Sequence, residues 1–382
     1  MPQPTIYPRF LFLFCLCTLL LIGCSSDDLV VPTDLPPATD VPPTAVPTVV
    51  LPTEEPTAVP VPTEIPAPTD VPTVEVTEVI SEAISAEPAP VVDDGVDNVG
   101  TGRQFVIPGE NVFPEGVSYN PTTGQFYVGA TSDGTLYQGD VNGPDAMTVF
   151  SEAGADGRTA AVGTKVDADG NLWVAGGRTG SMFVYDTTDA SLIAKFTTPE
   201  GEAFINDMAI TESGVYFTDS FRPILWRVTD LESGEAEPWL DFTGTAIQYT
   251  PGFNLNGIVS VADDRYLIVV HLIEGELYRI DTLTKEVTHI DTGVVPLTGG
   301  DGLAVIDETV YVTRNSFSEI VPIILADNYT RGTGGIVITS FLFAYPTTIA
   351  HTGNTFLVAN SQFDRQGGTP VLPFTVLQIL AP

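Results

Sequence analysis

Four side chains that can bind a hard metal ion lie at nearly regular intervals in the sequence. Two are carboxylates and two are carboxamides, and each opens a short run of β-forming residues: Glu115, Asn206, Asn256 and Asp301. At the equivalent positions of two further runs stand Val162 or Gly163, and Thr347. Two negative charges and two amide carbonyls suit a divalent cation, with water or substrate completing roughly six to eight positions. We expect Ca²⁺, with Mn²⁺ or Zn²⁺ as alternatives.

The dipeptides Asn256-Gly257 and Asp301-Gly302 have a second interpretation, because Asn-Gly and Asp-Gly are common turn sequences. Their register favours the metal site. Asn206, Asn256 and Asp301 each stand ten residues before a tyrosine of the next β-type run, so they occupy one place in a repeat. That place lies upstream of the hairpin turn. The turn interpretation stays the alternative.

A repeat of β-rich segments positions these residues. Counted from Glu115 to Thr347, successive copies lie 44 to 50 residues apart, which is the period of a four-stranded propeller blade. Six copies fill residues 101–382, and we predict an all-β, six-bladed β-propeller there. The first strands of the blades surround a central channel, so the residues that open them converge. We expect the ring to close by pairing of strands near 104–107 and 374–380.

The N-terminal residues carry the features of an export signal. Arg9 precedes an apolar stretch over residues 10–22, and all three cysteines fall within the first 24 residues, which excludes a disulfide framework or cysteine nucleophile in the propeller. Leu21-Ile22-Gly23-Cys24 resembles the lipobox of bacterial lipoproteins. It predicts a signal peptide over 1–23, lipidation of Cys24 and an extracytoplasmic protein anchored to a bacterial membrane, at the cell surface or in the periplasm. An uncleaved anchor or a simple signal peptide is the alternative.

Residues 24–100 are predicted to form a disordered linker. From residue 31 onward this segment repeats Pro-Thr units and contains no Lys or Arg, so it cannot bury a core and should form an extended stalk. The whole chain has a formal net charge of −35 and only three lysines. We therefore expect no nucleic-acid partner, and we expect a monomer.

The residues that open the blades resemble a known family, the senescence marker protein/gluconolactonase family of regucalcin-like, six-bladed propellers. The matching motifs are Glu115-Gly116, Asn206-Asp207, Asn256-Gly257 and Asp301-Gly302, in the same blade order. The resemblance implies that Glu115, Asn256 and Asp301 bind one divalent ion. It implies that Asn206 is a further ligand or a substrate contact. Asp301 would be the catalytic general base, and water activated by the metal is an equally good nucleophile.

The sequence departs from this family at two positions of the channel. Sugar-lactone members carry an arginine two residues before the third-blade Asn, where this chain has Phe204, and the second-blade position is Val162 or Gly163. Phe204 is thus a candidate substrate-binding residue, and an apolar lactone or ester fits better than a sugar acid. Arg158 and Arg178 could replace the lost cation or could be solvated loop residues.

Two functions follow from these residues. The first is a metal-dependent hydrolase acting on lactones or related esters. The alternative is a non-catalytic surface propeller that binds a ligand, polymer or protein, with Ca²⁺ as a structural ion. The histidines at 271, 289 and 351 are interpreted as structural residues in both cases.

Overall fold

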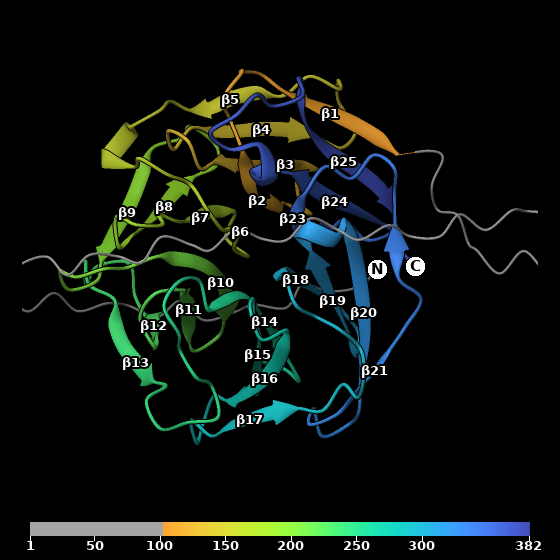
Figure 1. Ribbon diagram of the computed structural model, residues 1–382. Coiled ribbons are helices and arrows are strands. Elements are labelled where there is room, and N and C mark those ends of the chain that lie inside the picture. The colour runs from red at the N-terminus through yellow and green to blue at the C-terminus, as the bar shows by residue number, and fades with distance from the viewer. Residues whose placement is uncertain (1–101) are drawn as a thin grey trace, which may run out of the picture. The chain divides into compact units, whose positions relative to one another are not determined.

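The computed structural model describes residues 102–382, which form six antiparallel sheets arranged in a ring (Figure 1). The predicted six-bladed, all-β propeller is therefore confirmed. The predicted signal peptide (1–23), Cys24 and the Pro/Thr-rich segment up to residue 100 lie outside the described residues. Within 102–382, no helix is long and apolar enough to cross a membrane.

Each blade is one sheet, and its strands are ordered from the channel to the rim. Blade one contains β2 (Pro114–Tyr119), β3 (Gln125–Ala130), β4 (Leu136–Asp140) and β5 (Thr148–Ser151). Blade two contains β6 (Thr164–Val166), β7 (Asn171–Ala175), β8 (Ser181–Asp186) and β9 (Leu192–Thr197). Blade three contains β10 (Ile205–Thr211), β11 (Gly214–Asp219), β12 (Ile224–Val228) and β13 (Glu237–Asp241).

Blade four contains β14 (Leu255–Val261), β15 (Tyr266–His271), β16 (Glu276–Asp281) and β17 (Val287–Ile290). Blade five contains β18 (Gly300–Ile306), β19 (Thr309–Arg314), β20 (Glu319–Leu325) and β21 (Gly332–Gly334), with β22 (Ile338–Thr339) also paired to β20. Blade six contains β23 (Pro346–His351), β24 (Thr355–Asn360), β25 (Phe374–Leu380) and β1 (Arg103–Ile107). The described residues also contain three short 3₁₀ helices: η1 (Ala155–Gly157), η2 (Asn315–Phe317) and η3 (Phe363–Arg365).

The ring closes through the sixth blade. Strand β1 pairs antiparallel with β25, and Phe105 lies opposite Val376 at the centre of the pairing. The predicted closure is thus confirmed. It protects the edge that an open ring of blades would expose to other chains.

Hydrophobic side chains fill the space between the blades. The second strands are almost continuously apolar, as in the Tyr266–His271 run, because neighbouring blades cover both of their faces. Outer strands alternate instead, and in Leu192–Thr197 only Ala194 and Phe196 are buried. Large aromatic residues bridge adjacent blades, with the rings of Trp173 in blade two and Phe217 in blade three 6.2 Å apart. The blades therefore share continuous cores, which fix their inner ends relative to one another.

A bulge near the start of the inner strand recurs in five blades. In β2, β10, β14, β18 and β23 the pairing with the second strand is interrupted after the first residue and resumes three residues later. The first residue inside each gap is Glu115, Asn206, Asn256, Asp301 or Thr347. A bulge redirects a side chain out of the regular pleat. These residues therefore lie in strands, and the interpretation of Asn256-Gly257 and Asp301-Gly302 as turns is wrong.

The glycine that follows a bulge residue is required by the next blade. A Cβ atom on Gly257 would lie 2.4 Å from the carbonyl oxygen of Asp301, and one on Gly116 would lie 2.2 Å from that of Val162. The amide of Gly116 donates a 3.0 Å hydrogen bond to the same Val162 oxygen. Val162, rather than Gly163, is thus the second-blade equivalent of Glu115. Close backbone contact around the channel accounts for the glycine that follows Glu115, Asn256 and Asp301.

Candidate functional site

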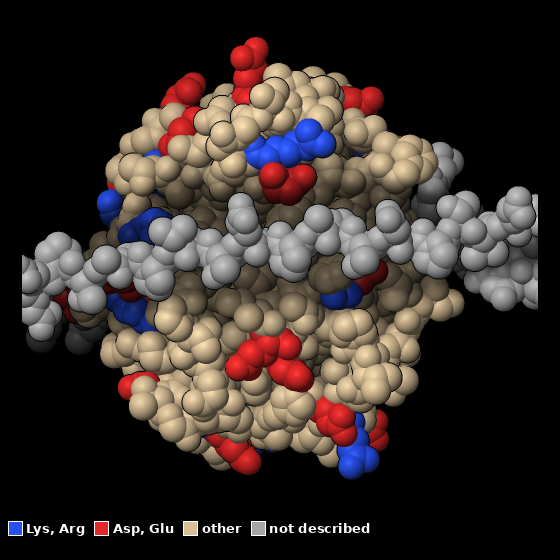
Figure 2. All heavy atoms as spheres, in the orientation of Figure 1, with Lys and Arg blue, Asp and Glu red and all other residues tan. Residues whose placement is uncertain are grey.

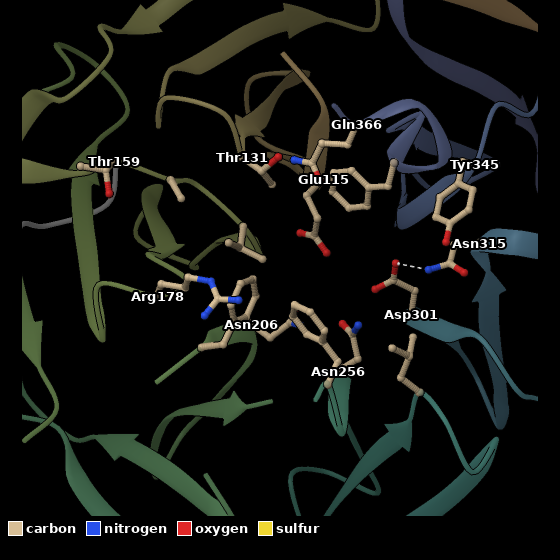
Figure 3. Close-up of a pocket in the computed structure, with 16 residues that line it drawn as sticks. Glu115, Thr131, Thr159, Arg178, Asn206, Asn256, Asp301, Asn315, Tyr345 and Gln366 are labelled. Atoms are coloured by element: carbon tan, nitrogen blue, oxygen red, sulfur yellow. Dashed lines mark hydrogen bonds between the residues drawn. The ribbon is translucent and has the colours of Figure 1, made fainter. Parts of the chain in front are cut away.

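A cavity of about 620 Å³ opens at one end of the channel, and the predicted site residues lie together in its wall. Glu115, Asn206, Asn256 and Asp301 all line it, although as many as 186 positions separate them in sequence. Figure 3 shows the carboxylates of Glu115 and Asp301 and the amide of Asn256 directed toward the same space. The four side chains belong to four different blades. Their convergence follows from the equivalent bulges that carry them.

Each of these four residues has a buried oxygen without a hydrogen-bond donor. The atoms are Glu115 Oε2, Asn206 Oδ1, Asn256 Oδ1 and Asp301 Oδ1. All four residues are at least 94% buried. A buried acceptor without a donor costs about 1–3 kcal/mol, so four such oxygens around one cavity fit a positively charged ligand. A divalent cation that prefers oxygen ligands would satisfy them together.

The remaining polar atoms of two of these residues are held in place. Asn206 Nδ2 donates a 2.9 Å hydrogen bond to Ser220 Oγ, and Asn315 Nδ2 donates a 3.1 Å hydrogen bond to Asp301 Oδ2. In Asn206 and in Asp301, one polar atom of the side chain makes a hydrogen bond within the protein, and the other, Oδ1, can bind a ligand. The arrangement orients the candidate ligands before any ion binds.

The two carboxyl groups are held in an environment that disfavours their charge. Burial raises the pKa of Asp301 to about 7, and the nearby Asp207 adds to the shift, while the hydrogen bond from Asn315 opposes it. Burial, followed by the charges of Asp301 and Asp207, also raises the pKa of Glu115 well above its usual value. A divalent cation would reverse this balance, because it stabilises both carboxylates. Asp207 itself lies 3.4 Å from Lys165 Nζ.

The candidate metal site needs the side-chain amides of Asn206 and Asn256 as ligands, in addition to its two carboxylates. Among residues 102–382, no three His, Cys, Asp or Glu side chains cluster closely enough to hold an ion. Two carboxylates and two carboxamides form an all-oxygen set, which fits Ca²⁺ better than Zn²⁺, whose sites favour nitrogen and sulfur. The donor chemistry of the cavity therefore fits the expected cation.

One wall of the cavity is apolar, as Phe204 predicts. Phe204 and Phe253 line the cavity, and their ring centroids are 4.8 Å apart in an edge-to-face arrangement. Phe221 contacts both rings, at 5.4 Å and 5.0 Å. Val162 lies in the cavity wall as well. Phe204 and Val162, where the chain departs from the motif that it resembles, thus both line the cavity.

The two arginines proposed as replacement cations differ in location. Arg178 lines the cavity, whereas Arg158 is fully buried and donates hydrogen bonds to Gly134 O, Ser151 Oγ and Tyr185 Oη. Both interpretations of Arg158, as a site cation and as a solvated loop residue, are wrong. A buried guanidinium needs several hydrogen-bond acceptors. Arg158 finds them in both blade one and blade two, and its side chain therefore links the two blades.

The three histidines lie outside the cavity wall. His271 is fully buried, its Nδ1 accepts a hydrogen bond from the amide of Glu274, and its Nε2 lies 3.2 Å from Gln248 O. His289 is exposed and pairs with Glu276 at 2.5 Å, and His351 lies in the wall of a second, smaller cavity. Their placement agrees with structural roles.

The sequence analysis missed two residues that directly follow a second strand, one in blade three and one in blade five. Asn315 follows β19 directly and contacts Asp301, and Ser220 follows β11 directly and contacts Asn206. Because first and second strands are antiparallel, the end of the second strand lies beside the start of the first. The same repeat that identified the first-strand positions could have identified these two. Tyr345 also lines the cavity, and it stands two residues before Thr347 as Phe204 stands two residues before Asn206. Gln366 lines it from a loop without a repeated pattern.

Charged side chains of both signs are scattered over the face shown in Figure 2, with uncharged residues between them. Within the cavity the distribution is simpler. Of its lining residues, only Glu115, Arg178 and Asp301 carry charge. Any charged ligand in this cavity would therefore meet two carboxylates and one guanidinium.

Comparison with solved structures finds many chains of similar fold. A gluconolactonase from Xanthomonas campestris is 12% identical with a TM-score of 0.52, covering 74% of this chain and 91% of that chain. A calcium-binding regucalcin from Agrobacterium tumefaciens is 15% identical with a TM-score of 0.51, covering 73% and 97%. A virginiamycin B lyase from Staphylococcus aureus is 14% identical with a TM-score of 0.51, covering 74% and 99%. No family model and no curated protein sequence matches the chain. At these identities the similarity concerns the fold.

Proposed function

We propose that the propeller is a divalent-metal-dependent hydrolase of lactones or related esters. The observation that carries the proposal is the set of four buried oxygens without donors, on Glu115, Asn206, Asn256 and Asp301, around one cavity. The gluconolactonase with a similar fold gives independent support to a propeller hydrolase. We further propose that Cys24 carries a lipid that anchors the protein outside the cytoplasm.

Glu115, Asn206, Asn256 and Asp301 would hold the cation, with Ca²⁺ as the expected ion. A bound divalent cation would polarise the carbonyl oxygen of the substrate. Asn315 keeps Oδ2 of Asp301 occupied, so Oδ1 would face both the cation and the attacking water. An oxygen that binds the cation is a weak base, so Asp301 as general base and water activated by the cation are equally good accounts of the attack. Water adds to the carbonyl carbon and gives up one proton, to Asp301 if this residue is the general base. The carbon–oxygen bond of the ester then breaks, and the alcohol oxygen leaves with that proton.

The apolar side of the cavity would act on the substrate in two ways. Phe204 and Phe253 would contact the hydrophobic part of the substrate and exclude water from that side of the cavity. Neither ring can replace the hydrogen bonds that an arginine at position 204 would give to sugar hydroxyls. Apolar lactones and esters are therefore the expected substrates.

The alternative is a non-catalytic propeller that binds a ligand, polymer or protein and uses Ca²⁺ to hold its blades. Phe204 favours it, because the residue that binds sugar lactones in the similar family is absent here. The two proposals differ in what the ion does. A structural ion would be bound without any turnover.

The test is turnover of a lactone and ester panel by the full chain, purified in mild detergent and stripped with a chelator. We expect activity that returns with Ca²⁺, Mn²⁺ or Zn²⁺ and that Asp301→Asn abolishes even at cation concentrations that saturate its weakened site. One bound cation per chain with no turnover on any substrate would favour the non-catalytic propeller. No bound cation at all would contradict both proposals.

A further inference from the structure

Three phenylalanines form a continuous, partly exposed apolar wall at the cavity. The rings of Phe204, Phe221 and Phe253 contact one another pairwise, with centroid separations of 4.8 to 5.4 Å. Each of the three is only half-buried. Three half-exposed phenyl rings in mutual contact leave apolar area in water, which a flat apolar ligand would cover.

A single carboxylate fixes the backbone of two of these phenylalanines. Oδ1 of Asp219, a fully buried residue, accepts hydrogen bonds from the amides of Phe204 at 2.9 Å and Phe221 at 3.1 Å. Its Oδ2 accepts from Arg222 Nε at 2.6 Å and Trp226 Nε1 at 3.2 Å. The backbone of the wall is thus fixed without a ligand. Such preorganisation lowers the entropic cost of binding.

Arg178 lies against this wall. Its guanidinium carbon is 4.7 Å from the centroid of the Phe221 ring. The residue lines the cavity, and Figure 3 shows its side chain extending into the space between the blades. Among the hydrogen bonds and ion pairs of residues 102–382, none involves the Arg178 side chain. Stacking uses the face of a guanidinium and leaves the N–H groups along its edge free to bind a carboxylate.

The charges of the cavity favour an anion once a cation is bound. Glu115 and Asp301 contribute two negative charges and Arg178 one positive charge. A divalent ion would neutralise the two carboxylates, so the guanidinium would be the remaining net charge. An anionic group beside the phenyl wall would then have a cation to pair with and no uncompensated carboxylate opposing it.

We propose that the substrate is a lactone or ester carrying both a carboxylate, bound by Arg178, and an aromatic or similarly flat apolar group, bound by the phenylalanine wall. This inference rests on the proposed hydrolase function for the reaction, but its recognition site does not. Arg178 is a specificity-determining residue here, supplied by blade two between β7 and β8. The wall comes from blades three and four.

The test compares two probes with one skeleton, 3-phenylpropanoate and the neutral 3-phenylpropanamide. Both are titrated calorimetrically into the Ca²⁺-loaded full chain in mild detergent. We expect the carboxylate to bind about tenfold more tightly than the amide, and Arg178→Gln to remove most of that preference without changing the affinity for the amide. Arg178→Lys should restore it in part, since it keeps the charge without the planar edge.

Two further variants separate the parts of the site. Phe253→Ala should weaken both probes about equally, because it removes apolar contact and no charge. Arg331→Gln removes an exposed arginine outside the cavity and should change neither affinity. For any ester that is turned over, Arg178→Gln should raise KM for the carboxylate-bearing compound and leave kcat near its original value.

Equal binding of the two probes, or a preference that survives Arg178→Gln in a folded protein, would overturn the inference. Carboxylate binding that depends on Arg178, together with no turnover of any ester, would support it and overturn the hydrolase proposal instead. Thermal melting of each variant establishes that it is folded. The two failures are thus distinguishable.

Discussion

The amide nitrogen of Asn315 donates a 3.1 Å hydrogen bond to Oδ2 of Asp301, and Oδ1 of the same carboxylate has no donor. One oxygen is thereby fixed and the other is left available at the cavity. Ser220 holds the amide nitrogen of Asn206 in the same way, at 2.9 Å. The arrangement occurs in blades three and five, and in both it connects the residue that follows the second strand to the candidate ligand on the first strand.

Removing the Asn315 side chain should weaken cation binding. Its hydrogen bond lowers the pKa of Asp301, so Asn315→Ala should favour the protonated, non-binding form and leave the carboxylate less well oriented. We expect a roughly ten- to hundredfold loss of Ca²⁺ affinity in a calorimetric titration, in line with about 1.5–3 kcal/mol for a hydrogen bond to a charged group. Unchanged affinity would show that Asn315 does not orient the site.

The stability of the metal-free protein should depend on pH through Asp301. Its pKa is raised from 3.8 to about 7 in the folded protein, so the folded state binds the proton more tightly than the unfolded chain does. The corresponding stability is present below about pH 4 and is lost as the pH rises toward 7. Wild type should therefore lose Tm over this range relative to Asp301→Asn, measured in chelator. Added Ca²⁺ should restore more Tm at pH 8 than at pH 5, and parallel pH curves for the two proteins would contradict the assignment.

His271 should contribute stability in the opposite direction. Burial lowers its pKa below 6.5, and its Nδ1 already accepts the Glu274 amide. Its stabilising contribution is present above pH 6.5 and is lost as the pH falls through the lowered pKa. An NMR titration of the imidazole should place the midpoint below 6.5. A midpoint at or above that value would refute the prediction, and cation binding by His271→Gln at pH 7.5 should match wild type.

A methyl group on the glycine behind a ligand should disrupt the channel. In Gly257→Ala the added Cβ would lie 2.4 Å from Asp301 O and 2.8 Å from Leu303 N, and both are backbone atoms that cannot move aside locally. We expect a loss of about 1–3 kcal/mol in unfolding free energy, measured by denaturant titration. Gly368→Ala is the matched control, since its nearest neighbour would lie at 3.4 Å. Equal stability of the two variants would contradict the proposed role of close packing.

The sequence predicted the ring of blades because the repeat of first strands is strong. It also predicted which side chains meet at the cavity, since equivalent positions in a propeller converge. It could not show why Gly257 follows Asn256, because that depends on the distance to the Asp301 backbone in the next blade. Nor could it show that Arg158 is buried, since its acceptors lie on three different segments. Gln366 reaches the cavity from an irregular loop, for which no periodic pattern exists.

The central claim is that one divalent cation binds between Glu115, Asn206, Asn256 and Asp301. Its most direct test is a calorimetric titration of Ca²⁺ into the chelator-treated full chain, in parallel with Glu115→Gln, which removes one of the two charges and keeps the shape. We predict one ion per chain for wild type and a severalfold to hundredfold weaker affinity for the variant, with unchanged blade structure by circular dichroism. Absence of binding to wild type, or equal affinity in Glu115→Gln, would contradict the account.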